Sequence, residues 1–162
     1  MKLIISLLFI INLNVLYSQV SNDSIIKKIE WLNKNYPNET WMQVSEKTLD
    51  NIFNLNLNTK IFLTPLDTLL KENSKYSHIF VKVFYFSSAY YRLTNPNEVD
   101  DYKVNKYSFD NVINYYLNLK KYDKEFNSNA IDFYIRLKDK NQLDSYIKRL
   151  AVSSEESSDE EH

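Results

Sequence analysis

Histidine and cysteine, on which many catalytic and metal sites depend, are almost absent from the chain. The sequence has no cysteine, and His78 is the only histidine before the last residue. Protein zinc sites use three or four ligands, mostly His and Cys, so this set excludes a zinc site of the usual composition. A Ser-His-Asp triad would have to use His78. Because His78 opens the most apolar part of the chain, we interpret it as a hydrogen-bonded structural residue.

Acidic side chains are the remaining candidates for catalysis. Glycoside hydrolysis needs two carboxyl groups about 5–9.5 Å apart, and such a pair leaves no local motif. Glu72, Asp100 and Asp101 are nominal candidates. The loop over 95–101 also collects oxygen ligands of the kind that calcium prefers. It lacks the alternate ligands, central glycine and distal glutamate of a helix-loop-helix calcium site, so we interpret it as a solvated loop and expect no bound metal.

Glycine is missing from all 162 positions. Glycine reaches backbone conformations that other residues avoid, and phosphate-binding loops and the dinucleotide fingerprint require it at fixed positions. Its absence argues against a nucleotide cofactor, and we expect no cofactor of any kind. A codon bias toward Asn, Lys, Ile and Tyr also explains the missing glycine, but the chain still lacks the residue that phosphate-binding loops require. Asparagine is expected to adopt positive φ at helix ends instead.

Tyrosine, with thirteen copies, is the residue type that best fits a recognition surface. It is favoured at protein interfaces because one end of its side chain is apolar and the other carries a hydroxyl group. The alternative is that these tyrosines line the edge of the core with their hydroxyl groups in water. The candidate binding residues are Tyr85, Tyr90, Tyr91, Arg92, Tyr115 and Tyr116.

The elements that must position these side chains are predicted to be helices. Apolar residues recur at helical spacing, and Thr64 with Pro65 forms a local helix start, in which Thr64 is the cap and Pro65 the first helical residue. Residues 78–93 are the most apolar part, and their length favours a central helix over a buried strand. We expect helices from residue 22 or 23 to about 36, from 45, from 64 to 71, over 78–93, from 108, and over 129–150 with a break near 139–141.

Five to seven helices with short connections predict an all-α domain, either a small helical bundle or a short array of helical hairpins. Residues 116–139 resemble one tetratricopeptide repeat, with a Leu and a Tyr-Asp pair in the first part and Ala130-Ile131 in the second. Lys120 stands where the family has a glycine, and no second copy at a 34-residue period is evident. The resemblance implies a helical array that binds a partner.

The first eighteen residues are predicted to be a cleavable signal peptide. Lys2 precedes an apolar run over 3–11, and Ser18 offers the small side chain needed beside the cleaved bond. An uncut anchor is the alternative, but a membrane-spanning helix needs roughly 20 apolar residues, and Asn12 and Asn14 interrupt this run. We therefore expect export to the periplasm or beyond, a mature chain from Gln19, and no membrane span after cleavage.

Charge is divided unevenly along the rest of the chain. Residues 19–150 hold 19 basic and 16 acidic side chains, whereas residues 151–162 hold five acids, four serines and no base. The acidic end is expected to be a disordered tail. The small positive excess on the domain is too weak to predict nucleic-acid binding, which requires a clustered basic face.

These observations favour an exported, non-enzymatic helical module, over residues 19–150, that recognises a protein or peptide partner. One alternative is a hydrolase that acts on envelope glycan or lipid through paired carboxylates. Another is an immunity-type inhibitor of an exported toxin, which the sequence does not separate from the first hypothesis.

Overall fold

The computed structural model describes residues 22–55, 57, 59–72 and 74–150. The predicted signal peptide (1–18) and acidic tail (151–162) lie outside these residues. The described residues form seven helices and no strand, which confirms the all-α prediction and makes the domain a small helical bundle. The helices are 22–34, α2 (Glu39–Asn54), α3 (Leu63–Lys71), α4 (Ser77–Thr94), α5 (Asp101–Leu119), α6 (Asn129–Asp139) and 143–150. No described helix has both the length and the apolar content that crossing a membrane requires.

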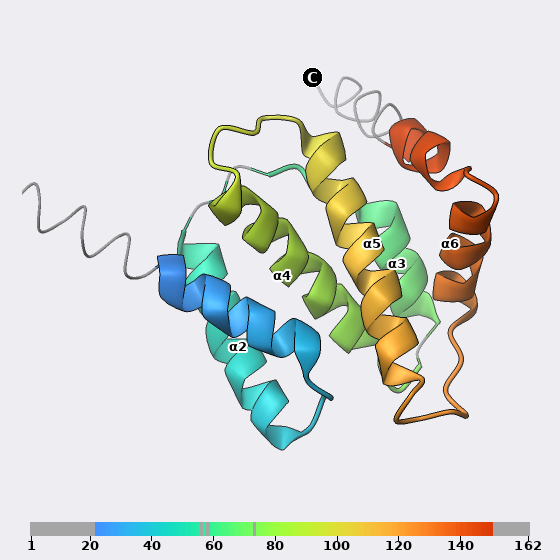
Figure 1. Ribbon diagram of the computed structural model, residues 1–162, viewed down its shortest axis with the longest axis horizontal. Helices are drawn as coiled ribbons and strands as arrows, with labels where there is room; N and C mark the ends of the chain where they lie inside the picture. The colour runs from blue at the N-terminus through green and yellow to red at the C-terminus, as the bar shows by residue number, and fades with distance from the viewer. Residues whose placement is uncertain (1–21, 56, 58, 73, 151–162) are drawn as a thin grey trace, which may run out of the picture.

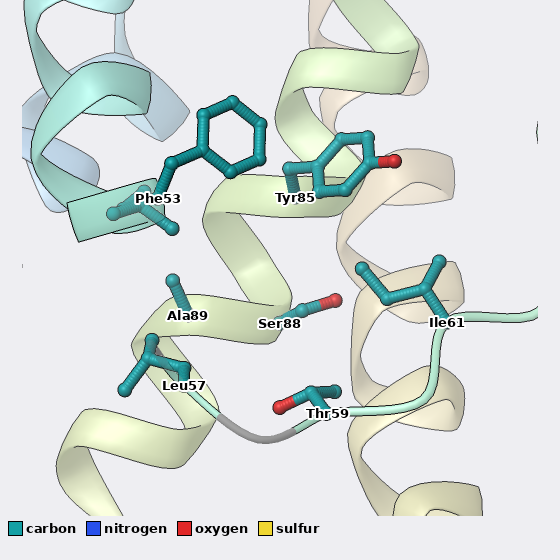
Figure 2. A pocket seen from close by; sticks show the side chains of 8 residues that line it. Phe53, Leu57, Thr59, Ile61, Tyr85, Ser88 and Ala89 are labelled. Carbon is teal, nitrogen blue, oxygen red and sulfur yellow. The ribbon is translucent and has the colours of Figure 1, made fainter. Parts of the chain in front are cut away.

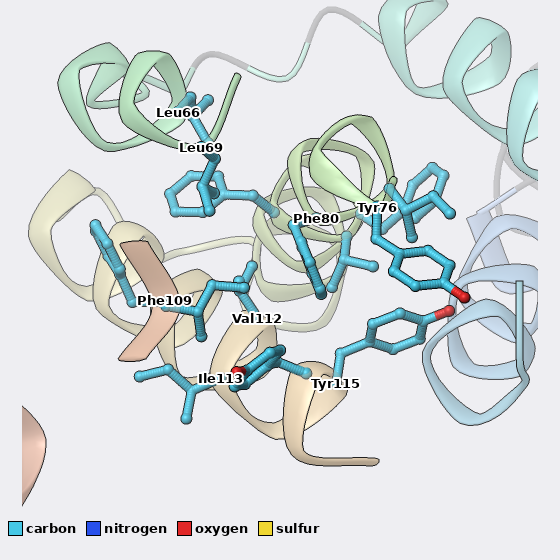
Figure 3. Close-up of a cluster of buried hydrophobic side chains, with 14 of the residues drawn as sticks. Leu66, Leu69, Tyr76, Phe80, Phe109, Val112, Ile113 and Tyr115 are labelled. Atoms are coloured by element: carbon cyan, nitrogen blue, oxygen red, sulfur yellow. The ribbon is translucent and has the colours of Figure 1, made fainter. Parts of the chain in front are cut away.

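Helix α4 is the central element, as its apolar sequence predicted. It lies between α2 and α5 (Figure 1) and also contacts α3, while α6 packs against α5 and α3. Its buried residues fall on every side of the helix, which is the pattern of a helix surrounded by others. Its side chains pack with those of α3 and α5 in the core, which includes Leu69, Phe80 and Phe109 (Figure 3).

Small residues let α4 and α5 approach each other without glycine. Ser88 of α4 and Ser108 of α5 are both buried, and their hydroxyl oxygens lie 2.8 Å apart. Each hydroxyl also lies within hydrogen-bond distance of a carbonyl of its own helix, four residues earlier, so the two hydroxyl hydrogens are shared among three acceptors. Buried polar groups need such partners, and the pair therefore fixes the contact between the two helices at no cost in unpaired hydroxyl groups.

Two helices begin earlier than the sequence predicted. Helix α2 starts at Glu39 rather than Ser45, because the Asn38 side chain caps it by accepting a bond from the Trp41 N–H (2.9 Å). Helix α5 starts at Asp101 rather than Ser108, where Asp100 accepts a bond from the Tyr102 N–H (2.9 Å). Both predictions were wrong for the same reason. They missed the cap residues: each first turn already carries a buried apolar residue, Trp41 in α2 and Val104 in α5, so the apolar pattern begins before Ser45 and Ser108.

The predicted start of α3 was also wrong in detail. The helix begins at Leu63 with Phe62 in the capping position, so Thr64 lies inside the first turn and makes no cap bond. Pro65 is tolerated there because the first four N–H groups of a helix have no partner within it. The predicted end at Lys71 is confirmed.

The predicted break between the last two helices is confirmed and shows how the chain turns without glycine. Asn141 has φ 56°, the only positive φ among the described residues. Its N–H bonds to the Lys138 carbonyl (2.9 Å), and the Gln142 N–H bonds to the Leu137 carbonyl (2.8 Å). This pair of bonds is the Schellman motif, in which glycine is the usual left-handed residue. Asparagine takes its place here, as expected.

Candidate functional site

The six predicted binding residues do not share one surface. Tyr115 and Tyr116 are 5% and 0% exposed and lie in the core. The Tyr115 hydroxyl donates to the Asn35 carbonyl (3.0 Å), and the Tyr116 hydroxyl donates to the Asp132 carboxylate (2.9 Å). Burial raises the pKa of Tyr115 above its ordinary value. Both tyrosines thus follow the alternative interpretation in part: they belong to the core, but their hydroxyl groups bond to protein rather than to water.

Tyr90 and Tyr91 pack on Tyr107 of α5. The Tyr90 and Tyr107 rings are nearly parallel, at 6° with centroids 6.1 Å apart, and the Tyr91 ring is tilted against Tyr107 at 5.2 Å. The Tyr90 hydroxyl donates to the Glu30 carboxylate (3.3 Å). Burial, and then the Glu30 charge, raise the pKa of Tyr90. These tyrosines are half-buried at the junction of α4, α5 and the helix over 22–34.

Arg92 is buried for most of its length. Its Nε donates to the Thr59 hydroxyl (3.0 Å), and its other nitrogens donate to the Glu98 carbonyl and the Asp101 carboxylate. A guanidinium group can serve several acceptors at once because its donors form a rigid fork. Arg92 therefore joins the segment after α2 to the start of α5.

The three nominal catalytic carboxylates each hold a helix end. Asp100 caps α5, and Asp101 pairs with Arg92. Glu72 accepts bonds from the Ser128 hydroxyl (2.6 Å) and from the Asn129 and Ala130 N–H groups at the start of α6. Ser128 also touches Tyr116 near the end of α5, about 22 Å along that helix from Asp101. Glu72 is thus too far from Asp100 and Asp101 to form a hydrolytic pair with either.

Other candidates for chemistry remain separate. His78 is exposed in the first turn of α4 and lies outside the core, although the sequence suggested a hydrogen-bonded structural residue. Most of the oxygen-rich residues over 95–101 are exposed, in agreement with a solvated loop. Among the described residues, no group of three or more His, Cys, Asp or Glu side chains could hold a metal ion.

The structure contains a groove along one face of α4 that the sequence did not predict. Two hollows of about 270 and 480 Å³ lie along this face and share Leu57 in their lining. Their floor is formed by α4 residues spaced three and four apart, which share one helix face: Tyr85, Ser88, Ala89, Arg92 and Leu93. We call this feature the α4 groove.

Most of the residues that line the smaller hollow are apolar (Figure 2). The rings of Phe53 and Tyr85 stand at one end, and Leu57 and Ile61 of the segment after α2 stand at the other. The two rings meet edge to face, with centroids 6.1 Å apart and planes at 68°. Phe53 is 64% exposed. Large exposed apolar side chains beside a hollow mark interaction sites.

The charges around the groove are paired. Lys82, one turn before Tyr85, forms an ion pair with Glu46 of α2, and Arg92 pairs with Asp101 at the other end. Glu98 is paired with Lys103 (2.7 Å), and that hydrogen bond holds the pKa of Glu98 below its usual value. The groove therefore has an apolar centre and little unbalanced charge.

Of the predicted binding residues, only Tyr85 and Arg92 line the α4 groove. The residues that the prediction missed are Phe53, Leu57 and Ile61. A signal for them does exist in the sequence. Apolar residues alternate with asparagine from Phe53 to Asn58, which is not a helical core pattern.

No protein-family model, curated protein or solved structure matches the chain. The class of protein is therefore defined by the fold and the site alone: a small all-α bundle with an apolar groove on its central helix. The resemblance of residues 116–139 to a tetratricopeptide repeat stays a prediction.

Proposed function

We propose that the chain is an exported, non-enzymatic binding module that recognises an apolar segment of a protein or peptide partner in the α4 groove. One observation carries the proposal: Phe53 is 64% exposed directly beside an apolar hollow of about 270 Å³. An aromatic side chain left in water costs free energy that binding would recover, at roughly 25 cal/mol for each Å² of apolar surface.

The dimensions of the groove support a peptide rather than a compact small molecule. The floor runs from Tyr85 to Leu93, eight residues of helix, or about 12 Å. Side chains four residues apart in an extended segment are separated by a similar distance, about 13 Å. Two apolar side chains at this spacing would occupy the two hollows, with the peptide backbone passing Leu57. The paired charges at both ends favour an uncharged segment.

Export is part of the proposal and rests on the predicted signal peptide. Its cleavage would release the chain from Gln19, and the partner would then be a periplasmic or secreted protein. An immunity-type inhibitor is the special case in which that partner is an exported toxin, and a toxin gene beside this one would support it.

The proposal is tested by selecting peptides from a random displayed library on the chain from Gln19 to His162. Phe53→Glu places a charge at the mouth of the groove. It is expected to lower the affinity for the selected peptides at least tenfold, which corresponds to a binding free energy weaker by about 1.4 kcal/mol or more. Phe133→Glu is the matched control, because Phe133 of α6 is 40% exposed and does not line the groove.

Affinities are measured by calorimetry, and the fold of each variant by circular dichroism. Equal weakening by Phe53→Glu and Phe133→Glu would place binding outside the groove. Failure to select any peptide that distinguishes the unmodified chain from Phe53→Glu would also overturn the proposal.

A further inference from the structure

Besides the two hollows of the α4 groove, a further hollow lies on another side of the molecule and has a more polar lining. It has a volume of about 300 Å³ and lies between the helix over 22–34, the end of α4 and one face of α5. Its walls carry four asparagines and two half-buried tyrosines. One of the tyrosines and three of the asparagines lie along one face of α5. The lining includes Asn33, Tyr90, Tyr107, Asn111, Asn114 and Asn118. We call it the asparagine pocket.

Two of these asparagines have unused hydrogen-bonding capacity. The Oδ1 atom of Asn33 and the Nδ2 atom of Asn111 are buried and have no partner among the described residues. Buried polar groups are usually paired, and leaving one unpaired destabilises the fold. Asn105 shows the usual arrangement in this protein. Its amide accepts from the Phe62 N–H and donates to the Lys60 and Asp101 carbonyls.

The two amides are placed so that a bound molecule could use them. Both line the same hollow, and the torsion that turns an asparagine amide is broad rather than confined to narrow wells. A half-turn about this torsion exchanges the oxygen and the NH₂ group of each amide, so that the buried, unpartnered atom can be turned toward the hollow. Together they offer an acceptor and a donor to one ligand.

The remaining lining restricts the chemistry of that ligand. Glu30 and Lys34 contribute one negative and one positive charge, so the pocket has no net charge to attract an ion. Glu30 is also occupied by the Tyr90 hydroxyl. Tyr90 and Tyr107, whose rings are nearly parallel, add aromatic surface to the lining.

We propose that the asparagine pocket binds a neutral saccharide through a single sugar ring. A sugar hydroxyl group both donates and accepts hydrogen bonds, which matches an unpartnered acceptor on Asn33 and an unpartnered donor on Asn111. The C–H groups on one face of a sugar ring pack on aromatic rings. A volume of about 300 Å³ lies at the small end of the range for ligand pockets, which suits one ring. This site is separate from the α4 groove, and neither proposal depends on the other.

The test is a titration of the isotopically labelled chain from Gln19 with glucose, galactose, mannose and N-acetylglucosamine, each up to about 50 mM because single-ring ligands bind weakly. At least one sugar is expected to shift the side-chain amide resonances of Asn33 and Asn111 in a saturable way. If no sugar does so, or if only a control amide such as acetamide does, the pocket holds solvent or another ligand class and the proposal is wrong.

Variants separate binding from folding. Asn33→Leu and Asn111→Leu keep the side-chain shape and are each expected to weaken the sugar about tenfold, since each removes at least one hydrogen bond. Their melting temperatures are expected to stay level or rise, because an unpartnered polar atom has been removed from the interior. The control Asn54→Leu, at an exposed position outside the pocket, should bind normally. Undiminished binding in both pocket variants would overturn the assignment.

Discussion

Arg92 joins three parts of the chain beside the α4 groove. Its donors reach Thr59 after α2, Glu98 in the loop after α4, and Asp101 at the start of α5. Arginine and tyrosine both combine a long apolar stem with a polar end, so a recognition surface and a core edge use the same residue types. For this reason the sequence could identify Tyr85 and Arg92 as notable, but it could not separate them from the buried Tyr115 and Tyr116.

At the residue scale, we predict that Arg92→Met destabilises the fold by about 2 kcal/mol. The Arg92 side chain is 10% exposed and its partner Asp101 is 33% exposed. Breaking a buried pair costs roughly 3–5 kcal/mol, and water reaching Asp101 reduces that cost. The measurement is urea unfolding, with Arg136→Met on the exposed side of α6 as the control. If Arg92 served binding alone, its replacement would weaken peptide capture and leave the unfolding midpoint in place.

At the scale of elements, the number of helices and most of their ends were predictable from the sequence. The break at Asn141 and the central position of α4 were predicted because local chemistry and apolar periodicity agreed there. The starts of α2 and α5 were missed by six and seven residues. Their first turns carry the buried residues Trp41 and Val104, but each helix start is marked by a single cap residue. Asparagine and aspartate are too common in this chain to stand out as caps.

The observed cap of α2, Asn38, and the predicted cap of α3, Thr64, can be compared directly. Asn38→Ala is expected to lower the free energy of unfolding by about 1 kcal/mol, the usual value of an N-cap, because it removes the bond to the Trp41 N–H. Thr64→Ala should change it by less than about 0.5 kcal/mol, since the Thr64 side chain is exposed and makes no cap bond. Chemical unfolding of both variants checks the pair. The opposite ranking would restore Thr64 as the cap of α3.

At the scale of the whole molecule, the α4 groove could not have been predicted, because its walls come from α2, the segment after it, α4 and the loop before α5. Periodicity describes one element at a time, whereas a groove depends on how far apart several elements pack. The same holds for the asparagine pocket. Asn33 and Asn111 are separated by most of the described chain and become neighbours only through the packing of α5 on the helix over 22–34.

Buried tyrosines make the stability of the fold sensitive to alkali. Burial raises the pKa of Tyr76 to about 12, and it raises the pKa values of Tyr134 and Tyr146 above their ordinary value. Above pH 10 the unfolded chain loses tyrosine protons that the folded chain retains, so stability falls as pH rises. We predict a steep drop in melting temperature between pH 10 and 12.

The variant Tyr76→Phe shows whether the drop has this origin. At pH 7 the variant is expected to be less stable by about 1–2 kcal/mol, because it loses the bonds to Tyr36 (2.9 Å) and Asp123 (3.0 Å). Above pH 11 that difference should shrink, since the variant has no hydroxyl proton to lose at this position. Tyr122→Phe, at a 70% exposed site, should follow the unmodified profile. A difference that stays constant from pH 7 to 12 would contradict the explanation.

The left-handed backbone at Asn141 has a genetic consequence. A mutation that introduces glycine inside any of the described helices costs up to about 1 kcal/mol relative to alanine, whereas at codon 141 it relieves the steric strain of a side chain at positive φ. Selection for folding alone therefore removes new glycines from the helices and accepts one at this codon. A glycine at position 141 should therefore be tolerated better than a glycine inside any of the described helices.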